Sequence, residues 1–251
     1  MVSALKQDIK KSDAPAPHTE GSGERARSSA SAARTAPRWW RRPWIIPLAL
    51  LVTAFLAFQA TRFAGLNESE APIPRHDGFP LYYPLLIGHM AFGAVAMVTV
   101  CFQAWPWLRR NHPAVHRVSG RVYVLSTLPC GVIGLVIVGF APPTGRVGVA
   151  VGTVLWLATT VMGFWMARGR RYDLHRRFML YSFAILMNII AALLVVIVGL
   201  SLPFGIGVDV LVEVARWSWV AGIVLVDWHL YRHSRRLLRR RPLNVTYKSP
   251  A

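Results

Sequence analysis

Six stretches of about 20 apolar residues run through this chain, and a stretch of that length spans a bilayer as a helix. Such a run favours a helix because hydrocarbon offers no partners for backbone N–H and C=O groups. The predicted spans are 44–64, 83–105, 119–141, 147–167, 177–200 and 210–231. Their short connections make neighbouring helices antiparallel. We therefore predict an all-α, polytopic membrane protein with six transmembrane helices.

The charged residues support this class and argue against others. They make up only 16% of the chain, whereas a typical soluble domain has about 25%, so an ordinary soluble enzyme is disfavoured. Of the 29 lysines and arginines, 25 fall on one side of the predicted spans. Positive residues favour the cytoplasmic side, which predicts a cell-membrane protein with both termini in the cytoplasm. The formal net charge of +18 then reflects topology and contact with anionic lipid headgroups, not nucleic-acid binding.

The two ends of the chain are polar. Residues 1–43 are rich in Ser, Ala, Pro, Gly and basic residues and have no apolar period, which is typical of a disordered segment. We predict a disordered basic cytoplasmic tail at 1–43, a transmembrane domain at 44–231 and a basic cytoplasmic tail at 232–251. The end of the sixth helix, around Asp227, is interpreted as facing lipid headgroups. The chain has no Gly-rich phosphate loop and no Cys-x-x-Cys pair, and whether it is an enzyme stays open.

Small and polar residues within the spans predict some of the packing. Gly148 and Gly152 have the small-xxx-small spacing that permits close contact between helices. Pro129 lies inside the third span, where a neighbouring helix can compensate for the backbone hydrogen bond that it removes. Glu213 and Arg216, three residues apart in the sixth span, predict a local ion pair.

Two connections on the predicted cytoplasmic side resemble each other. Each has a tryptophan, paired arginines, a His-Arg pair and then a tyrosine, with His116 in the first and His175 in the second. This repeat predicts that helices two to five form a core four-helix bundle. His116 and His175 then begin two helices at similar depth, where two imidazoles can bind a metal or a haem iron. The alternative is that both are interfacial histidines in ordinary basic loops.

His89 lies inside the second span, where an ionisable group usually faces the bundle interior and is functional. Gln103 follows fourteen residues later on nearly the same helical face, so the two form a polar intramembrane stripe. The structural alternative for His89 is a hydrogen bond to a backbone carbonyl of a neighbouring helix. His89 lies near the outer end of its span, so it cannot share a ligand with His116.

Arginines flank both His-Arg pairs. Most of them follow the positive-inside pattern, but guanidinium groups at this depth can also bind haem propionates or anionic lipid headgroups. The candidates for this role are Arg117, Arg121 and Arg176. Arg121 falls about one turn after His116, at the start of the span.

Several short strings in the chain resemble one bacterial family. They are His89, Phe-Gln at 102–103, Leu-Arg-Arg at 108–110, His-Pro at 112–113, His-Arg-x-x-Gly-Arg-x-Tyr at 116–123, Leu-Trp-Leu-Ala-Thr-Thr at 155–160 and His-Arg-Arg-x-Met at 175–179. Together they resemble the predicted membrane proteins grouped as domain of unknown function 2306. The family-like core is about 85–200. The resemblance implies a membrane protein and brings no established activity with it.

The helix layout is also similar to that of six-helix b-type cytochromes, which hold two haems by four histidines on a four-helix core. Only the pair His116 and His175 has a matching place here, because the fourth predicted span carries no histidine. The similarity implies at most one haem b, with electron transfer as the function and His89 near a quinone or proton path. The alternatives are a small transporter or a lipid- or partner-binding subunit with His89 and Gln103 in a polar pocket, and a structural subunit without a ligand.

Overall fold

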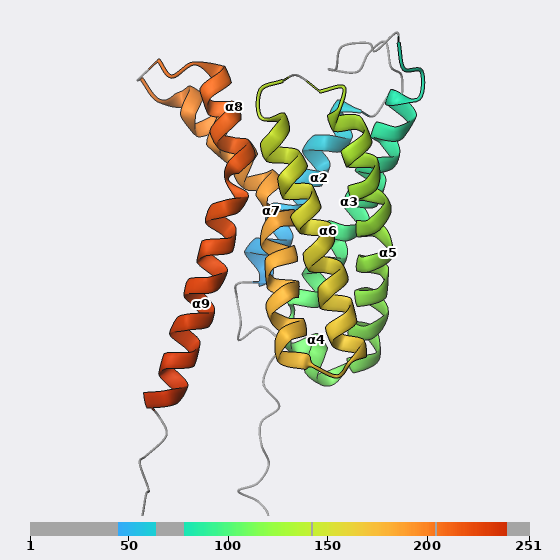
Figure 1. Cartoon of the computed structure of the whole chain (residues 1–251), viewed down its shortest axis with the longest axis vertical. Helices are drawn as coiled ribbons and strands as arrows, with labels where there is room; N and C mark the ends of the chain where they lie inside the picture. The colour runs from blue at the N-terminus through green and yellow to red at the C-terminus, as the bar shows by residue number, and fades with distance from the viewer. Residues whose placement is uncertain (1–44, 64–77, 142, 204, 240–251) are drawn as a thin grey trace, which may run out of the picture. The chain divides into compact units, whose positions relative to one another are not determined.

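The computed structural model describes residues 45–63, 78–141, 143–203 and 205–239, and these residues form helices and turns without any strand. Five of the described helices are long and apolar enough to cross a membrane (Figure 1). They are α2 (Ile45–Arg62), α3 (Tyr82–Ala104), α5 (Pro113–Val138), α6 (Arg146–Arg168) and α7 (Tyr172–Ser201). The other three are α4 (Pro106–Asn111), α8 (Val208–Trp217) and α9 (Trp219–Arg239). The predicted tail at 1–43 and the residues after 239 lie outside the described residues.

The first five predicted spans each correspond to one of these apolar helices. Two of the helices begin earlier than predicted, because their first turns are polar and hydropathy reports only the apolar part. Pro113 lies in the first turn of α5, where its fixed φ suits a helix and its missing N–H costs nothing. As a result His116 and His175 lie within the first turns of α5 and α7.

The predicted sixth span, 210–231, is not a single helix. The chain there is divided at Ser218 into α8 and α9, and neither is among the five apolar helices of the described residues. The Ser218 hydroxyl donates to the carbonyl of Ala215 at 2.7 Å, a bond within the helix that competes with the regular ladder and bends it. The Ser218 hydroxyl is also hydrogen-bonded to the side-chain amide of Asn188 on α7. Beyond the break α9 continues as a helix through the first part of the predicted tail, as far as Arg239.

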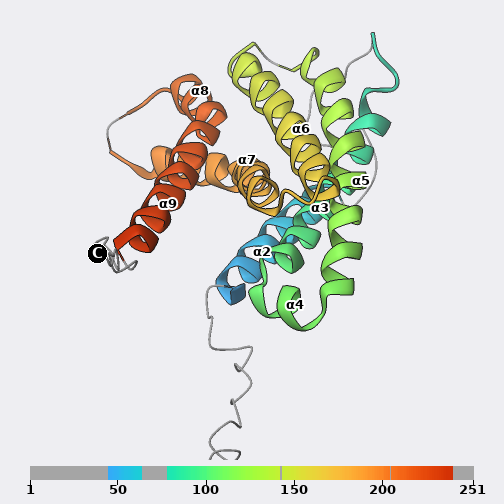
Figure 2. The ribbon, with the colours of Figure 1, turned by 60° about the horizontal axis from the view of Figure 1, so that its bottom comes forward.

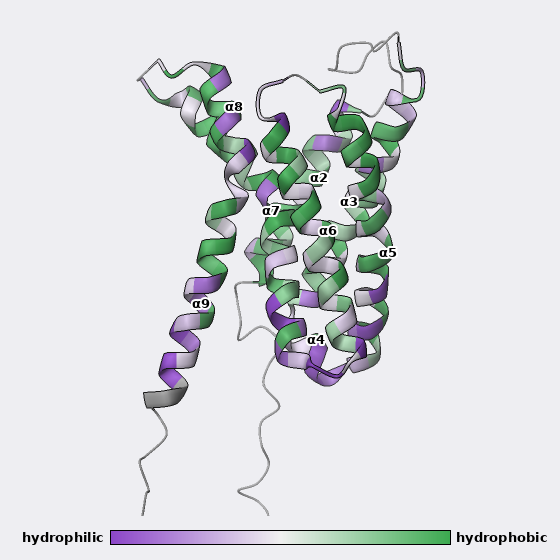
Figure 3. Cartoon of the chain, in the orientation of Figure 1, coloured by the Kyte–Doolittle hydropathy of each residue, from purple (hydrophilic) through white to green (hydrophobic). Residues whose placement is uncertain are grey.

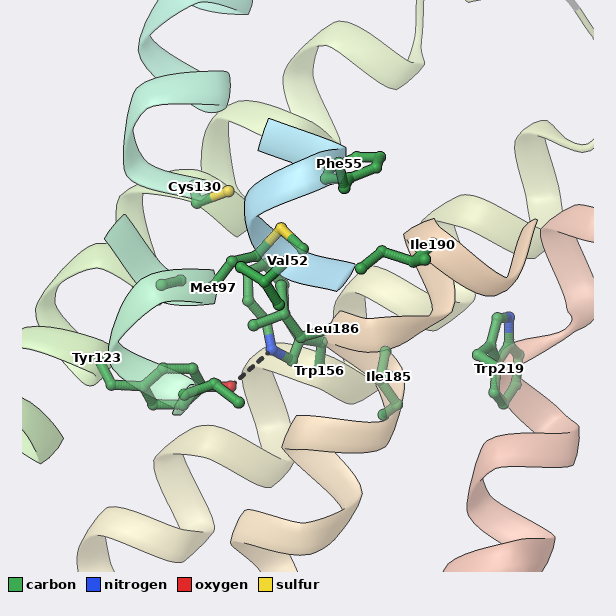
Figure 4. Close-up of a cluster of buried hydrophobic side chains, with 12 residues drawn as sticks. Val52, Phe55, Met97, Tyr123, Cys130, Trp156, Ile185, Leu186, Ile190 and Trp219 are labelled. Carbon is green, nitrogen blue, oxygen red and sulfur yellow. Dashed lines mark hydrogen bonds between the residues drawn. The ribbon is translucent and has the colours of Figure 1, made fainter. Parts of the chain in front are cut away.

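The apolar helices pack in the order of the chain. α3 packs on α5, α5 on α6 and α6 on α7, and α3 also touches α7. α2 packs on α3, and α7 lies between α9 and the other helices (Figures 1 and 2). A cluster of buried side chains from α2, α3, α5, α6, α7 and α9 fills the interior (Figure 4). α5 and α7 thus meet across this interior, with α6 packed against both.

The outward faces of the helices carry large apolar side chains. Leu50 is 66% exposed, Leu125 70% and Val147 63%. A soluble protein rarely exposes such continuous apolar surface, whereas a lipid environment solvates it. Hydrophilic residues instead gather at the end of α5, α6 and α7 where α4 lies (Figure 3). The apolar helix faces therefore suit the hydrocarbon interior of a bilayer, and the hydrophilic helix ends suit its aqueous surface.

The predicted close approach at Gly148 and Gly152 is confirmed. A Cβ atom at Gly148 would lie 3.1 Å from the carbonyl oxygen of Arg216, and one at Gly152 would lie 3.0 Å from the indole of Trp219. The Trp219 indole N–H donates to the carbonyl of Gly148 at 3.0 Å. The two glycines thus form the surface of α6 on which the junction of α8 and α9 is held.

Candidate functional site

His116 and His175 occupy equivalent positions, each the fourth residue of its helix, α5 and α7. Tyr123 follows His116 by seven residues on α5, and Ser182 follows His175 by seven residues on α7. Seven residues are about two turns, so each pair shares a helix face at a separation of about 10.5 Å along the axis. The hydroxyl oxygens of Tyr123 and Ser182 are 2.6 Å apart. This bond joins α5 and α7 at equal offsets from the two histidines, which supports a similar depth for the two imidazoles.

The two imidazoles differ in how their ring nitrogens are used. His175 Nδ1 lies 2.8 Å from the carbonyl oxygen of Gly163 on α6. A carbonyl only accepts, so this Nδ1 carries the proton and Nε2 has the free lone pair. His116 Nδ1 is buried and has no hydrogen-bond partner within the described part of the chain. Both side chains are half-buried.

Gln103 holds the start of α5 against the end of α3. Its side-chain nitrogen donates to the carbonyl of His116 at 2.8 Å and to the hydroxyl of Ser119 at 2.6 Å. Gly120 packs beside this side chain, where even a Cβ atom would make only an ordinary van der Waals contact, 3.4 Å from the Gln103 amide oxygen. Gln103 thus positions the backbone of His116, a role that its place in the polar stripe did not predict.

The arginines near His116 and His175 differ in whether they interact with an imidazole. The charges of Arg109 and Arg117 act on the His116 imidazole. Arg117, Arg121 and Arg176 are all exposed, and within the described residues neither Arg121 nor Arg176 makes a hydrogen bond to an imidazole. Of the three predicted propionate or headgroup ligands, only Arg117, the sequence neighbour of His116, has a charge that acts on this imidazole.

A buried chain of hydrogen bonds lies two turns deeper than the histidines. The Trp156 indole donates to the Tyr123 hydroxyl at 3.1 Å (Figure 4). Thr160 Oγ1 donates to the carbonyl of Trp156 at 2.8 Å and lies 2.6 Å from Ser182 Oγ. Because the Thr160 hydroxyl donates its proton to the Trp156 carbonyl, the Ser182 hydroxyl must donate to Thr160 Oγ1. The Tyr123 hydroxyl then donates to Ser182 Oγ. The chain therefore begins at the Trp156 side chain and ends at the Trp156 backbone.

All the side chains of this chain of bonds are buried. Tyr123 is 1% exposed, and Thr160 and Ser182 are 0% exposed. We did not predict this feature from the sequence. The available indication was the hydroxyl residues inside apolar spans, together with the equal offsets of Tyr123 and Ser182 from the two histidines.

The predicted repeat is inexact at the tyrosine. Tyr181, matched with Tyr123 in the sequence, lies six residues after its histidine instead of seven, and so points elsewhere. Its hydroxyl donates to Asp227 on α9, and Arg177 pairs with the same carboxylate at 3.5 Å. Ser182 takes the equivalent place of Tyr123, while Tyr181 fastens α9 to α7.

His89 makes a structural contact at a different depth. Its Nδ1 donates to the carbonyl of Cys130 on α5 at 2.9 Å, and the Cys130 thiol donates back to the carbonyl of His89 at 3.3 Å. Gly134 leaves room for the ring, since a Cβ atom there would lie 3.0 Å from His89 Cε1. Both His89 and Gln103 thus bond to α5, but at different turns, and within the described residues no hydrogen bond joins them.

Glu213 caps the N-terminus of α6 and does not form the predicted ion pair with Arg216. Its carboxylate accepts from the backbone N–H of Gly145 at 2.6 Å and from the Trp217 indole at 2.9 Å. Gly145 has φ 73°, a conformation that favours glycine, and it precedes the first turn of α6. A carboxylate is stabilised at a helix N-terminus. The prediction of a Glu213–Arg216 ion pair was wrong for the described residues, because Glu213 caps α6.

The apolar helices, their lipid-compatible faces and their polar ends define a multi-pass helical membrane protein. Residues 86–229, more than half of the chain, match the family model described as "Predicted membrane protein (DUF2306)". The chain belongs to this family, domain of unknown function 2306, as the sequence strings indicated. The match extends beyond the expected core at 85–200 and includes α8 and the first half of α9. The comparisons with curated proteins and with solved structures gave no match.

Proposed function

We propose that this protein is a membrane electron-transfer protein that binds one haem b between His116 and His175. The observation that supports the proposal is the hydrogen bond between Tyr123 and Ser182, each seven residues after one of the two histidines, which joins α5 and α7 across the interior of the helices. Bis-histidine haem sites in helical bundles are built from such facing side chains.

The residues present fit this cofactor. A metal-bound histidine usually donates its other ring N–H to a carbonyl or carboxylate, which fixes the ring and directs the lone pair to the metal. His175 has this arrangement through Gly163. A buried nitrogen without a partner, as on His116, is costly unless a ligand or water satisfies it. No group of three or more His, Cys, Asp or Glu side chains suited to a metal ion occurs in the described residues, but a haem needs only two axial ligands.

The chain's own residues would orient and tune the site. Gly163 fixes the His175 ring, and Gln103 anchors the backbone of His116. The guanidinium groups of Arg109 and Arg117 would offset the negative charge of propionates. When bound, a haem supplies reversible one-electron chemistry at its iron. The proposal requires a redox partner at the membrane, such as a quinone.

The proposed topology places the protein in the cell membrane with both termini in the cytoplasm. The positive-inside distribution supports this orientation, since the basic α4 region and the α6–α7 turn lie at one end of the helices. We propose that α3, α5, α6 and α7 form the core bundle. α8 and α9 would together make a sixth, interrupted crossing, and anionic headgroups would contact the basic end.

The non-redox alternative has less support. A polar pocket containing both His89 and Gln103 would need the two side chains to share a space, whereas each is engaged with a different turn of α5. The transporter and lipid-binding hypotheses therefore depend on features other than this pair.

The test is a reduced-minus-oxidised visible spectrum of the purified full-length protein from haem-replete cells. We expect the bands of a b-type haem in the native protein and in His229→Ala, a control that removes an exposed histidine from α9. We expect their loss in His116→Ala and in His175→Ala. Haem content per chain, measured after extraction, should be close to one.

Two results would overturn the proposal. One is a colourless native protein that is folded by circular dichroism and monodisperse in detergent. The other is haem that is retained both in His116→Ala and in His175→Ala. A loss confined to one of the two variants would also contradict a shared ligand.

A further inference from the structure

α9 has two opposite faces with different surroundings. The less exposed face packs towards α7 and contains Trp219, Gly222, Ile223, Val226 and Leu230. These positions recur every three or four residues and form one stripe along the helix. The opposite face is exposed along its whole described length, and it contains no residue that the hydrogen bonds or ion pairs of α9 with α7 use.

The exposed face changes character from one end to the other. It begins with apolar side chains such as Val224 and Leu225, which are 57% and 68% exposed. Two aromatic residues follow, Trp228 and Tyr231, at 58% and 60% exposure. The face ends in basic residues, which are Arg232, Arg235 and Arg236.

The aromatic and basic residues form one groove of about 360 Å³, which is lined by Trp228, Tyr231, Arg232, Arg235 and Arg236. Arg232 Cζ lies 5.0 Å from the centre of the Trp228 ring, and Arg235 Cζ lies 5.4 Å from the centre of the Tyr231 ring. Stacking of this kind holds a guanidinium in place while its N–H groups stay available.

No carboxylate lines this groove. The acidic residue of α9 nearest to it in sequence is Asp227, and its carboxylate is already bonded to Tyr181 and Arg177 of α7. Three guanidinium groups are thus gathered without a neutralising partner in the groove. Planar guanidinium groups bind phosphate through paired hydrogen bonds.

We propose that this face of α9 is a binding site for an anionic phospholipid. The acyl chains would lie along Val224 and Leu225, the glycerol region beside the aromatic residues, and the phosphate among the arginines. Trp228 to Arg235 is seven residues, about 10.5 Å of helix, and this order of side chains matches the passage from hydrocarbon through the interface to the headgroups. The site rests on the membrane crossing and not on the proposed haem.

The experiment measures lipid retained by the full-length protein after extraction from vesicles of phosphatidylglycerol and phosphatidylcholine in equal amounts. Arg232→Gln/Arg235→Gln removes two charges from the groove. The matched control, Arg110→Gln/Arg168→Gln, removes two charges from exposed positions on α4 and α6 that lie at the basic end of the helices but do not line the groove. Native mass spectrometry counts the bound lipids directly, with no use of the visible spectrum.

We expect the native protein and the control to retain phosphatidylglycerol in preference to phosphatidylcholine. The groove variant should bind it roughly 30-fold more weakly, because each basic residue near an anionic surface contributes about fivefold. The single variant Arg235→Gln should lose about fivefold, and it keeps the proposal testable if the double variant does not fold.

Three outcomes would overturn the inference. Equal losses in the groove variant and the control would mean that only total charge matters. Unchanged retention in the groove variant would place the lipid elsewhere. Displacement of the lipid by millimolar inorganic phosphate would show that the groove recognises a free anion and not a membrane lipid.

Discussion

Replacing Tyr123 by phenylalanine removes one hydroxyl from the chain of bonds that links α5, α6 and α7. The Trp156 indole loses its acceptor, whereas Ser182 keeps its bond to Thr160. An unpaired buried donor costs about 1–3 kcal/mol, and side-chain hydrogen bonds measured within membranes reach at most about 1.7 kcal/mol. We therefore expect Tyr123→Phe to lower the free energy of unfolding by about 1–2 kcal/mol.

The bond itself is measured by a double-mutant cycle. Tyr123→Phe and Ser182→Ala each remove the same 2.6 Å contact, so the double variant should be less destabilised than the two single losses together. We expect a coupling energy of about 1 kcal/mol, in the upper half of the membrane range because both side chains are almost fully buried. The assay is reversible unfolding by sodium dodecyl sulfate in mixed micelles, followed by circular dichroism.

A second cycle serves as the control. Thr99 on α3 is also buried, but its hydroxyl bonds only to carbonyls of its own helix, at Val95 and Ala96. Tyr123→Phe and Thr99→Ala should therefore be additive within about 0.5 kcal/mol. If the cycle of Tyr123 with Ser182 is equally additive, the two hydroxyls do not bond in the membrane and the argument for level histidines fails.

Three further predictions concern other contacts. Gly152→Leu should destabilise the protein by about 1–3 kcal/mol, because even a Cβ atom there would crowd the Trp219 indole. Thermal unfolding tests this, with Val151→Leu at the exposed neighbouring position as the control. Equal melting temperatures of the two variants would refute the prediction. Asp227→Asn should cost less than about 1 kcal/mol, since its contacts to Tyr181 and Arg177 are half-exposed, and a larger loss in the same melt would mean that α9 depends on that carboxylate. A phosphatase reporter fused after Ala251, which works only outside the cytoplasm, should be inactive, and an active fusion would reverse the proposed topology.

The sequence predicted the helices well where hydropathy alone decides them. α2, α3 and α6 begin and end within two residues of their predicted spans. The sixth span failed because its break at Ser218 depends on one hydroxyl and on the docking of Trp219 against α6, 71 residues away in the chain. A local pattern of apolar residues cannot indicate a contact between residues so far apart in the chain.

The candidate site was predicted in part for a similar reason. The equal depth of His116 and His175 followed from the matching connections, and the hydrogen bond between Tyr123 and Ser182 supports it. The buried hydroxyl chain was missed because its members are 22 to 59 residues apart. The role of Gln103 was missed because helix periodicity gives the face of a residue and not its bonding partner.

The hydrogen-bond chain that starts and ends at Trp156 also limits how this protein can move. A shift of α5, α6 or α7 along its own axis by a single turn would carry it about 5.4 Å past its neighbours, and both bonds of that helix to the other two would break together. These three helices should therefore behave as one rigid block, with no gradual sliding between them. Any gating or partner-induced motion is then confined to the elements outside the circuit, such as α9, which packs on α7 largely through one face.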